Sequence, residues 1–171
     1  SEHDLRRAVG IRRDATGRAS ILTIASENAL AATLAVIGGT DEALRLVDHS
    51  ASCAAAEGRT DKLVKAHNCR GNILVVANDA NGALKAYRDA MNLRSGAYGS
   101  LYDHHGFSKA YTQLKKHGEA LHHSEEARRL AAHFLRNEDQ HFRSEIEKQY
   151  QSLQEVMRKG RRKKSVPPLE P

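Results

Sequence analysis

The chain has 171 residues, three prolines, no tryptophan and a formal net charge of +6. This length suits one domain with a hydrophobic core, and no apolar stretch approaches the roughly 20 residues that a membrane span requires. The first ten residues also lack the apolar segment of a signal peptide, so the sequence predicts a soluble protein.

The sequence predicts helices along most of the chain. All three prolines lie at or after Pro167, so no proline interrupts a helix before that point. Helix-length segments lie between breaks that are rich in glycine and polar residues. These breaks are at 36–44, 57–62, 77–82, 94–100, 116–119 and 136–139.

The breaks define an expected order of elements. Residues 1–19 are expected to form an N-terminal segment that is partly helical or disordered. Three helix pairs then occupy 20–137, followed by a capping helix at 138–158 and a basic, proline-containing tail at 159–171. The pairs are expected at about 20–57, 62–95 and 100–135.

One spacing of small residues recurs in all three pairs. In the middle pair Ala83 follows Gly71 by twelve residues, and Tyr87 follows Ala83 by four. Ala43 and Ala120 hold the place of Ala83 in the first and third pairs. Small side chains let two helix backbones approach closely, so we expect Ala83 at a helix crossing with Gly71 and Tyr87 beside it.

This frame resembles the tetratricopeptide repeat (TPR). The matching segments are "ENALAATL" (27–34) with "EALRLVDHS" (42–50), "HNCRGNIL" (67–74) with "ALKAY" (83–87), and "HHGFSKAY" (104–111) with "EALHHSEEA" (119–127). The bulky first residue of the family pattern is here Glu27, His67 or His104. The resemblance implies an all-α helical-repeat solenoid of three TPR-like helix pairs with a long C-terminal capping helix.

The resemblance also implies a function. It points to a non-catalytic scaffold or adaptor that binds a peptide or helix of another protein, or that anchors in a multi-protein assembly. In the family the first helix of each pair lines a groove, and here that surface is polar and mildly basic, which suits a partner of some acidic character. The implied groove residues are Asn28, Lys65, Asn68, Asn72, Tyr102, His105, Lys109 and Gln113, together with Val36 and Val76.

An apolar stripe runs along the predicted final helix. Phe142, Ile146, Tyr150, Leu153 and Met157 recur at intervals of four, four, three and four. The first half of this stripe is expected to cap the third pair. The second half suits a partner helix or self-association.

Six basic residues near the end of the chain account for the whole net charge, so the rest of the chain is neutral. They are Arg158, Lys159, Arg161, Arg162, Lys163 and Lys164. This run suits contact with a polyanion, a nuclear localisation signal or a solubilising tail. Two other functions therefore stay open, a nucleic-acid-associated subunit of a ribonucleoprotein and a TPR sensor or regulatory segment of a larger signalling protein. We expect a cytoplasmic location, or a nuclear one if the basic run is a signal.

No residue pattern predicts catalysis, a metal site or a cofactor. The histidines at 103–105 and 122–126 lack the His-Glu-x-x-His spacing of a zinc site. Cys53 and Cys69 have neither metal-ligand nor disulfide-scaffold spacing, which favours a reducing compartment. No nucleophile has a recognisable base and orienting group, so we expect a protein that is not an enzyme.

Overall fold

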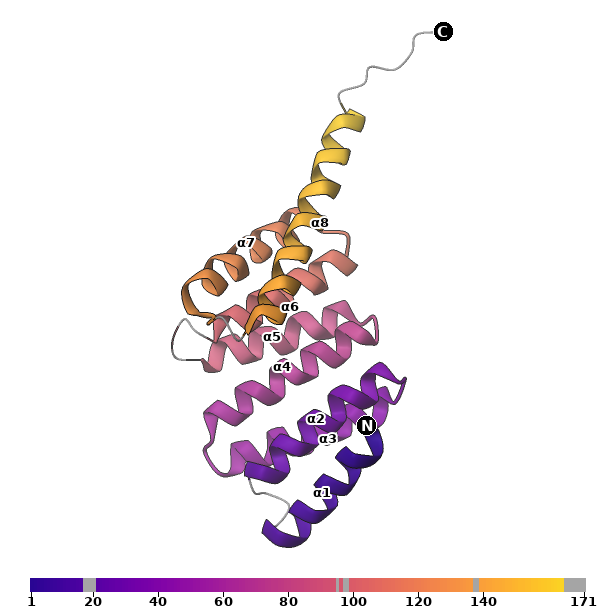
Figure 1. Cartoon of the computed structure of the whole chain (residues 1–171), viewed down its shortest axis with the longest axis vertical. Helices are drawn as coiled ribbons and strands as arrows, with labels where there is room; N and C mark the ends of the chain where they lie inside the picture. The colour runs from indigo at the N-terminus through magenta and orange to yellow at the C-terminus, as the bar shows by residue number, and fades with distance from the viewer. Residues whose placement is uncertain (17–20, 95, 97–98, 137–138, 165–171) are drawn as a thin grey trace. The chain divides into compact units, whose positions relative to one another are not determined.

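The computed structural model describes residues 1–16, 21–94, 96, 99–136 and 139–164, and the regular elements in this part are α-helices (Figure 1). The all-α class predicted from the sequence is confirmed. The chain divides into two compact units, Ser1–Gly96 and Ala97–Pro171. The first unit holds α1 (Glu2–Thr16), α2 (Ile21–Val36), α3 (Thr40–Ala56), α4 (Thr60–Val76) and α5 (Ala80–Leu93). The second holds α6 (Ser100–Gln113), α7 (His117–Phe134) and α8 (Gln140–Lys164).

The turns after α2, α3, α4 and α6 share one geometry. Each contains a residue in the left-handed region, with φ between 57° and 93°, at Gly38, Gly58, Asn78 or Lys115. The next residue then donates its N–H to a carbonyl five positions earlier, over 2.8 to 3.0 Å. This pattern satisfies carbonyls that the end of a helix would otherwise leave unpaired, and it stops the helix without a proline.

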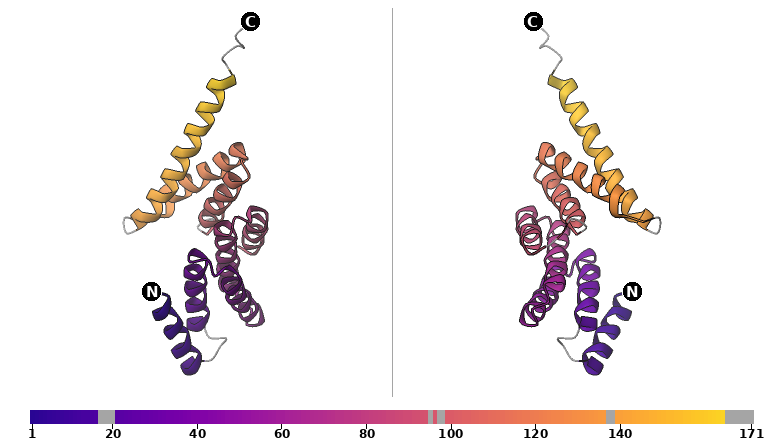
Figure 2. Two further views of the ribbon diagram at one scale, coloured as in Figure 1. Left: turned by 90° about the vertical axis from the view of Figure 1, so that its right-hand side faces the viewer. Right: turned by 90° about the vertical axis from the view of Figure 1, so that its left-hand side faces the viewer.

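In the first unit, α2 packs against α1, α3 and α4, and α4 packs against α3 and α5 (Figure 2). The main core cluster mixes aliphatic side chains with alanines. Its buried members are Val9, Leu30, Ala31, Leu34, Ala35, Ala43, Val47, Ala66 and Ile73. The alanines at the helix contacts allow the backbones to lie close together.

The middle pair shows how small and large residues fit at a helix contact. Gly71 is buried, and a Cβ atom added to it would lie 2.5 Å from Cε1 of Tyr87. Ala83, which we expected opposite Gly71, is fully buried, but the side chain that lies on Gly71 is the ring of Tyr87. The glycine is therefore the space into which the tyrosine ring fits.

In the second unit, α6 and α8 both pack against α7. The core between them consists of Leu101, Ala127, Leu130, Ala131, Leu135 and Ile146. The apolar stripe of α8 faces this packing, since Ile146 is 1% and Leu153 2% exposed. Burial of Leu153 shows that the packed face continues into the second half of α8. The last turns of α8 extend past α7 (Figures 1 and 2).

The segment at 1–19, for which we expected a partly helical or disordered chain, contains the helix α1, whose Leu5 and Val9 pack on the first core. The predicted end of the final helix was wrong, because this helix continues to Lys164 instead of ending at 158. Lysine and arginine are good helix formers, so the basic run prolongs the helix despite Gly160.

Candidate functional site

The predicted groove residues of the first unit lie on α2 and α4, which contact each other. Lys65 and Asn72 are exposed, whereas Asn28 and Asn68 are half-buried. The carboxamide oxygens of Asn28 and Asn68 are buried and have no hydrogen-bond partner among the described residues. The oxygen of Asn72 accepts a hydrogen bond from the hydroxyl of Tyr87 over 2.8 Å, so Asn72 also supports the helix pair.

Two valines add apolar surface to the ends of these helices. Val36, the last residue of α2, is 74% exposed, and Val76, the last residue of α4, is 53% exposed. Ile37, in the turn after α2, is exposed as well. The predicted groove positions on α2 and α4 therefore combine amides, a lysine and exposed aliphatic side chains.

In the second unit, α8 contacts the predicted groove residues Tyr102, His105 and Lys109 of α6. The ring of Tyr102 stacks on Phe142, with 5.1 Å between centroids. Glu145 accepts from Nζ of Lys109 over 2.5 Å and lies 3.2 Å from Nε2 of His105. Gln113, the fourth residue, is exposed. In this unit the chain's own helix therefore contacts the face on which we expected a partner.

Charges at this contact are matched. Burial opposes ionisation of Glu145, but the neighbouring Lys109 and His105 hold its pKa below the usual value. Burial, with Lys109, lowers the pKa of His105, although Glu145 acts in the opposite direction. Gln149 adds a hydrogen bond to the hydroxyl of Thr112 over 3.0 Å. Polar contacts thus fix α8 against α6 in addition to its apolar packing.

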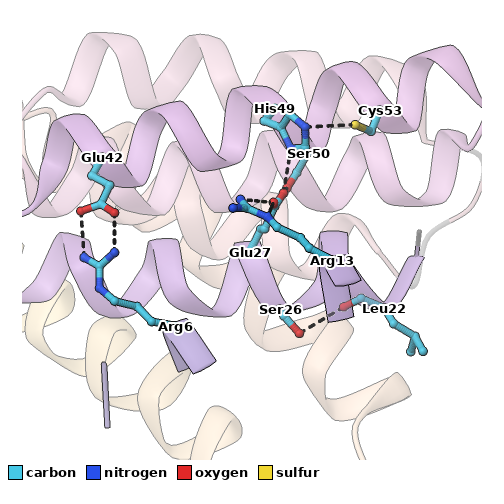
Figure 3. Close-up of polar contacts among 9 residues, drawn as sticks. All are labelled: Arg6, Arg13, Leu22, Ser26, Glu27, Glu42, His49, Ser50 and Cys53. Atoms are coloured by element: carbon cyan, nitrogen blue, oxygen red, sulfur yellow. Dashed lines mark hydrogen bonds and ion pairs between the residues drawn. The ribbon is translucent and has the colours of Figure 1, made fainter. Parts of the chain in front are cut away.

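A second polar cluster surrounds Glu27, which is fully buried on α2 (Figure 3). Arg13 of α1 donates to its Oε1 from Nη2 over 2.6 Å and from Nε over 3.1 Å. Its Oε2 lies 2.9 Å from Nδ1 of His49 and accepts from the hydroxyl of Ser50 over 3.3 Å. A buried carboxylate is costly unless it is paired and hydrogen-bonded, and here α1 and α3 supply the partners.

The cluster extends to a thiol (Figure 3). Nε2 of His49 lies 3.6 Å from Sγ of Cys53, one helical turn further along α3. Burial raises the pKa of the Cys53 thiol, and the charges of Glu27 and Glu57 raise it further. A thiol, an imidazole and a carboxylate therefore lie in sequence here. The spacing of His49 and Cys53 was visible in the sequence, but nothing in the sequence placed Glu27 beside them.

Further contacts fasten α1 to its neighbours. Arg6 forms a bidentate ion pair with Glu42 of α3, over 2.6 and 2.9 Å (Figure 3). It also donates a hydrogen bond to Glu2. Arg12 bonds the hydroxyl of Ser26 and, over 3.1 Å, the carbonyl of Leu22. Charged side chains thus hold α1 in place beside its few apolar contacts.

A histidine pair joins α6 to α7. Nδ1 of His104 lies 2.9 Å from Nδ1 of His123, whose ring stacks against both Phe107 and Tyr111, with 4.9 and 5.4 Å between centroids. Burial lowers the pKa of His123 to about 4, with the charges of His104 and His122 acting in the same direction. Burial also lowers the pKa of His104. Within the described ranges, no group of three or more histidine, cysteine, aspartate or glutamate side chains is arranged to hold a metal ion.

The basic run near the end of the chain is described only in part. Arg158 and Lys159 are exposed on α8, and Lys159 pairs with Glu155 over 2.7 Å. The side chains of Arg161, Arg162, Lys163 and Lys164 lie outside the described residues. No helix in the described part is long and apolar enough to cross a membrane.

Comparison with known proteins shows which solved structures have a similar fold. No protein-family model matches the chain, and the search of curated proteins finds no match. Among solved structures, two crystal structures of a Podosopora anserina protein, described as a kinesin light chain of nearly identical TPR-like repeats, are similar. One is 16% identical, with a TM-score of 0.59, over 94% of this chain and 87% of that chain. The other is 17% identical, with a TM-score of 0.59, over 91% of this chain and 86% of that chain.

The chain has a TPR-like repeat fold. Its helix pairs are α2 with α3, α4 with α5, and α6 with α7. The TPR-like resemblance inferred from the sequence is confirmed at the level of the fold.

The polar clusters begin at equivalent places in this TPR-like fold. Glu27, His67 and His104 occupy the position that is bulky in the family pattern. Glu27 anchors the Arg13 cluster, and His104 pairs with His123. His67 lines a cleft of about 310 Å³ between α3, α4 and α5. Glu27 and His104 thus contact polar partners on neighbouring helices.

Proposed function

We propose that the chain is a non-catalytic scaffold that holds a peptide or helix of a partner protein on the surface formed by α2 and α4. The TPR-like fold supports this proposal at the coarse level, because such folds suit protein–protein interaction. The single observation that carries the choice of surface is the pair Asn28 and Asn68. They are 40 residues apart, the same interval as Ala43 and Ala83, and therefore occupy equivalent places on α2 and α4.

Both asparagines have unused hydrogen-bonding capacity. Their oxygens are buried without a partner among the described residues, and an unpaired buried acceptor costs about 1–3 kcal/mol. Rotation of the carboxamide about its last bond lets the group turn towards a peptide backbone, to which it both donates and accepts. The equivalent residue of the third pair, His105, already has a partner in Glu145.

The surroundings indicate the chemistry of the partner. Lys65 is exposed on the same helix as Asn68, and it suits an acidic side chain. Val36 and Val76 offer aliphatic surface at the ends of the two helices. The contacts of α8 with α6 have the same character, since they combine an acidic residue with an aromatic one. We therefore propose a partner segment with acidic and apolar residues.

A matched pair of variants tests the proposal. Wild-type protein, the double variant Lys65→Glu and Val76→Asp, and the control Lys85→Glu are used as bait, and the captured proteins are identified by mass spectrometry. Lys85 is exposed on α5, away from the proposed surface, so the control repeats the lysine-to-glutamate change of the double variant elsewhere. We expect a partner of wild type and control to be lost from the double variant, with unchanged circular dichroism.

Equal capture by all three proteins places the binding surface elsewhere. Asn72 is left intact because its bond to Tyr87 supports the fold. Contact of the basic run at 158–164 with a polyanion, and self-association through α8, stay predictions that this experiment does not address.

A further inference from the structure

The side chains of Cys53, His49 and Glu27 form a chain of contacts from a thiol to a carboxylate (Figure 3). Sγ lies 3.6 Å from Nε2 of the imidazole, and Nδ1 lies 2.9 Å from Oε2 of the carboxylate. In many enzymes a nucleophilic side chain is activated by an adjacent base, and a third group orients that base. We propose that Cys53 is a modification site that reacts with hydroperoxides to form a sulfenic acid, with His49 as the base and Glu27 as the positioning residue.

The surroundings of Glu27 determine which ring nitrogen of His49 carries a proton and which one can accept the thiol proton. Arg13 occupies Oε1, while Ser50 and His49 share Oε2, so the carboxylate has an acceptor facing the imidazole. Nδ1 therefore carries the ring proton of neutral His49. Nε2 is then the basic nitrogen, and it faces the thiol.

The thiol needs this base. Burial and the charges of Glu27 and Glu57 raise the pKa of Cys53, and its place in the last turns of α3 near the negative end of the helix acts in the same direction. Cys53 is therefore a neutral thiol near pH 7, and its proton must leave as the sulfur attacks. Cys53 is partly exposed, so a small oxidant can reach it.

The reaction balances with hydrogen peroxide as the co-reactant. The sulfur attacks one peroxide oxygen, an S–O bond forms and the O–O bond breaks. His49 takes the thiol proton and gives it to the departing hydroxide, which leaves as water. The cysteine is oxidised to sulfenic acid and the peroxide is reduced.

Acyl transfer is less suited to this site. An acyl intermediate needs hydrogen-bond donors for its oxyanion, commonly backbone N–H groups. Cys53 lies inside α3, where the backbone N–H groups are bonded within the helix. A peroxide develops its charge on the leaving hydroxide, which the imidazolium of His49 can protonate.

Cys69 is an internal reference in the same chain. Its Sγ faces the backbone carbonyl of Asn28 at 3.6 Å, and burial raises its pKa to about 11. No histidine contact to its sulfur is found among the described residues. We expect it to be oxidised more slowly than Cys53 in the folded protein.

The first experiment compares the folded chain with the same chain in urea at equal pH. Both are treated with dilute hydrogen peroxide and dimedone, and the labelled Cys53 and Cys69 peptides are quantified over time by mass spectrometry. With His49 acting as base, folded Cys53 should be labelled about tenfold faster than unfolded Cys53. Burial and a raised pKa without a base give the reverse order, so a folded rate at or below the unfolded rate overturns the proposal.

The second experiment compares His49→Gln with the control His67→Gln, which replaces another partly buried histidine on the neighbouring helix α4. Circular dichroism establishes that both remain helical. We expect His49→Gln to lower the labelling rate of folded Cys53 about tenfold and the control to leave it unchanged. Equal labelling rates of Cys53 in the two variants would show that His49 does not act as the base. If His49→Gln does not fold, the comparison of folded and unfolded wild type decides alone.

Discussion

The ring of Tyr87 lies on Gly71 so closely that an added Cβ atom would come within 2.5 Å of the ring. Gly71→Ala should therefore destabilise the first unit by about 1–3 kcal/mol, because the ring or the helix must move. The control is Gly10→Ala on α1, where an added Cβ meets nothing within 4 Å. Urea unfolding should show the control stabilised by up to about 1 kcal/mol, since alanine favours a helix. Similar changes in both variants would contradict the close fit.

At Lys115, in contrast to Gly71, a substitution should raise the free energy of unfolding. This residue has φ 57° in the turn between α6 and α7, where a side chain is strained. Lys115→Gly should raise the free energy of unfolding by about 0.5–1 kcal/mol. Lys116→Gly is the matched control, because Lys116 has φ −85° and glycine gains nothing there. Stabilisation by both changes, or by neither, in thermal unfolding would argue against strain at Lys115.

The stacked histidines give the second unit a pH-dependent stability. The pKa of His123 is lowered to about 4 in the folded protein, from an ordinary 6.5. Between these values the unfolded chain binds the proton and the folded one does not, so stability is present above about pH 6.5 and is lost towards pH 4. Urea unfolding at several pH values measures the slope.

A substitution at His123 tests the assignment of this slope. His123→Phe keeps a ring against Phe107 and Tyr111 but cannot take up a proton, so the slope between pH 4 and 6.5 should flatten. His141→Gln, at an exposed position of α8, serves as the control and should retain the slope. An unaltered slope in His123→Phe would assign the effect to other groups.

The two arginines of α1 should differ in their importance. Arg13→Ala leaves the fully buried carboxylate of Glu27 without its cation, and we expect a loss of about 2–3 kcal/mol, below the range for a pair buried on both sides. Arg6→Ala removes more ion pairs, but they are exposed and screened by water, so the loss should be much smaller. Chemical unfolding of the two variants side by side checks the order, and the reverse order would contradict it.

Much of the scaffold could be predicted from the sequence. The glycine and polar breaks located the turns, and the recurring small residues indicated paired helices, because both signals are local. The TPR-like frame even identified Gly71 as the place of close packing. The sequence left open whether 1–19 is partly helical or disordered, because its apolar residues are few and the contacts of α1 with its neighbours depend on Arg6, Arg12 and Arg13.

The polar clusters could not be predicted in the same way. Glu27 lies 14 residues from Arg13 and 22 from His49, and no spacing rule links such residues before the helices are packed. The histidines at 122–126 looked like a set, but His123 pairs with His104 on α6 while His122 is exposed. The groove residues on α6 were placed on the expected helix, yet the sequence did not reveal that α8 contacts them.

Within each unit, the helices pack mainly on the next helix along the chain or the one after it. Contacts between residues that are close in sequence need little loop closure, which favours rapid folding. A chain of this kind can also fold as it is synthesised, because the core around α2, α3 and α4 requires nothing that follows residue 96. The first unit should therefore reach its native packing while the second is still being translated.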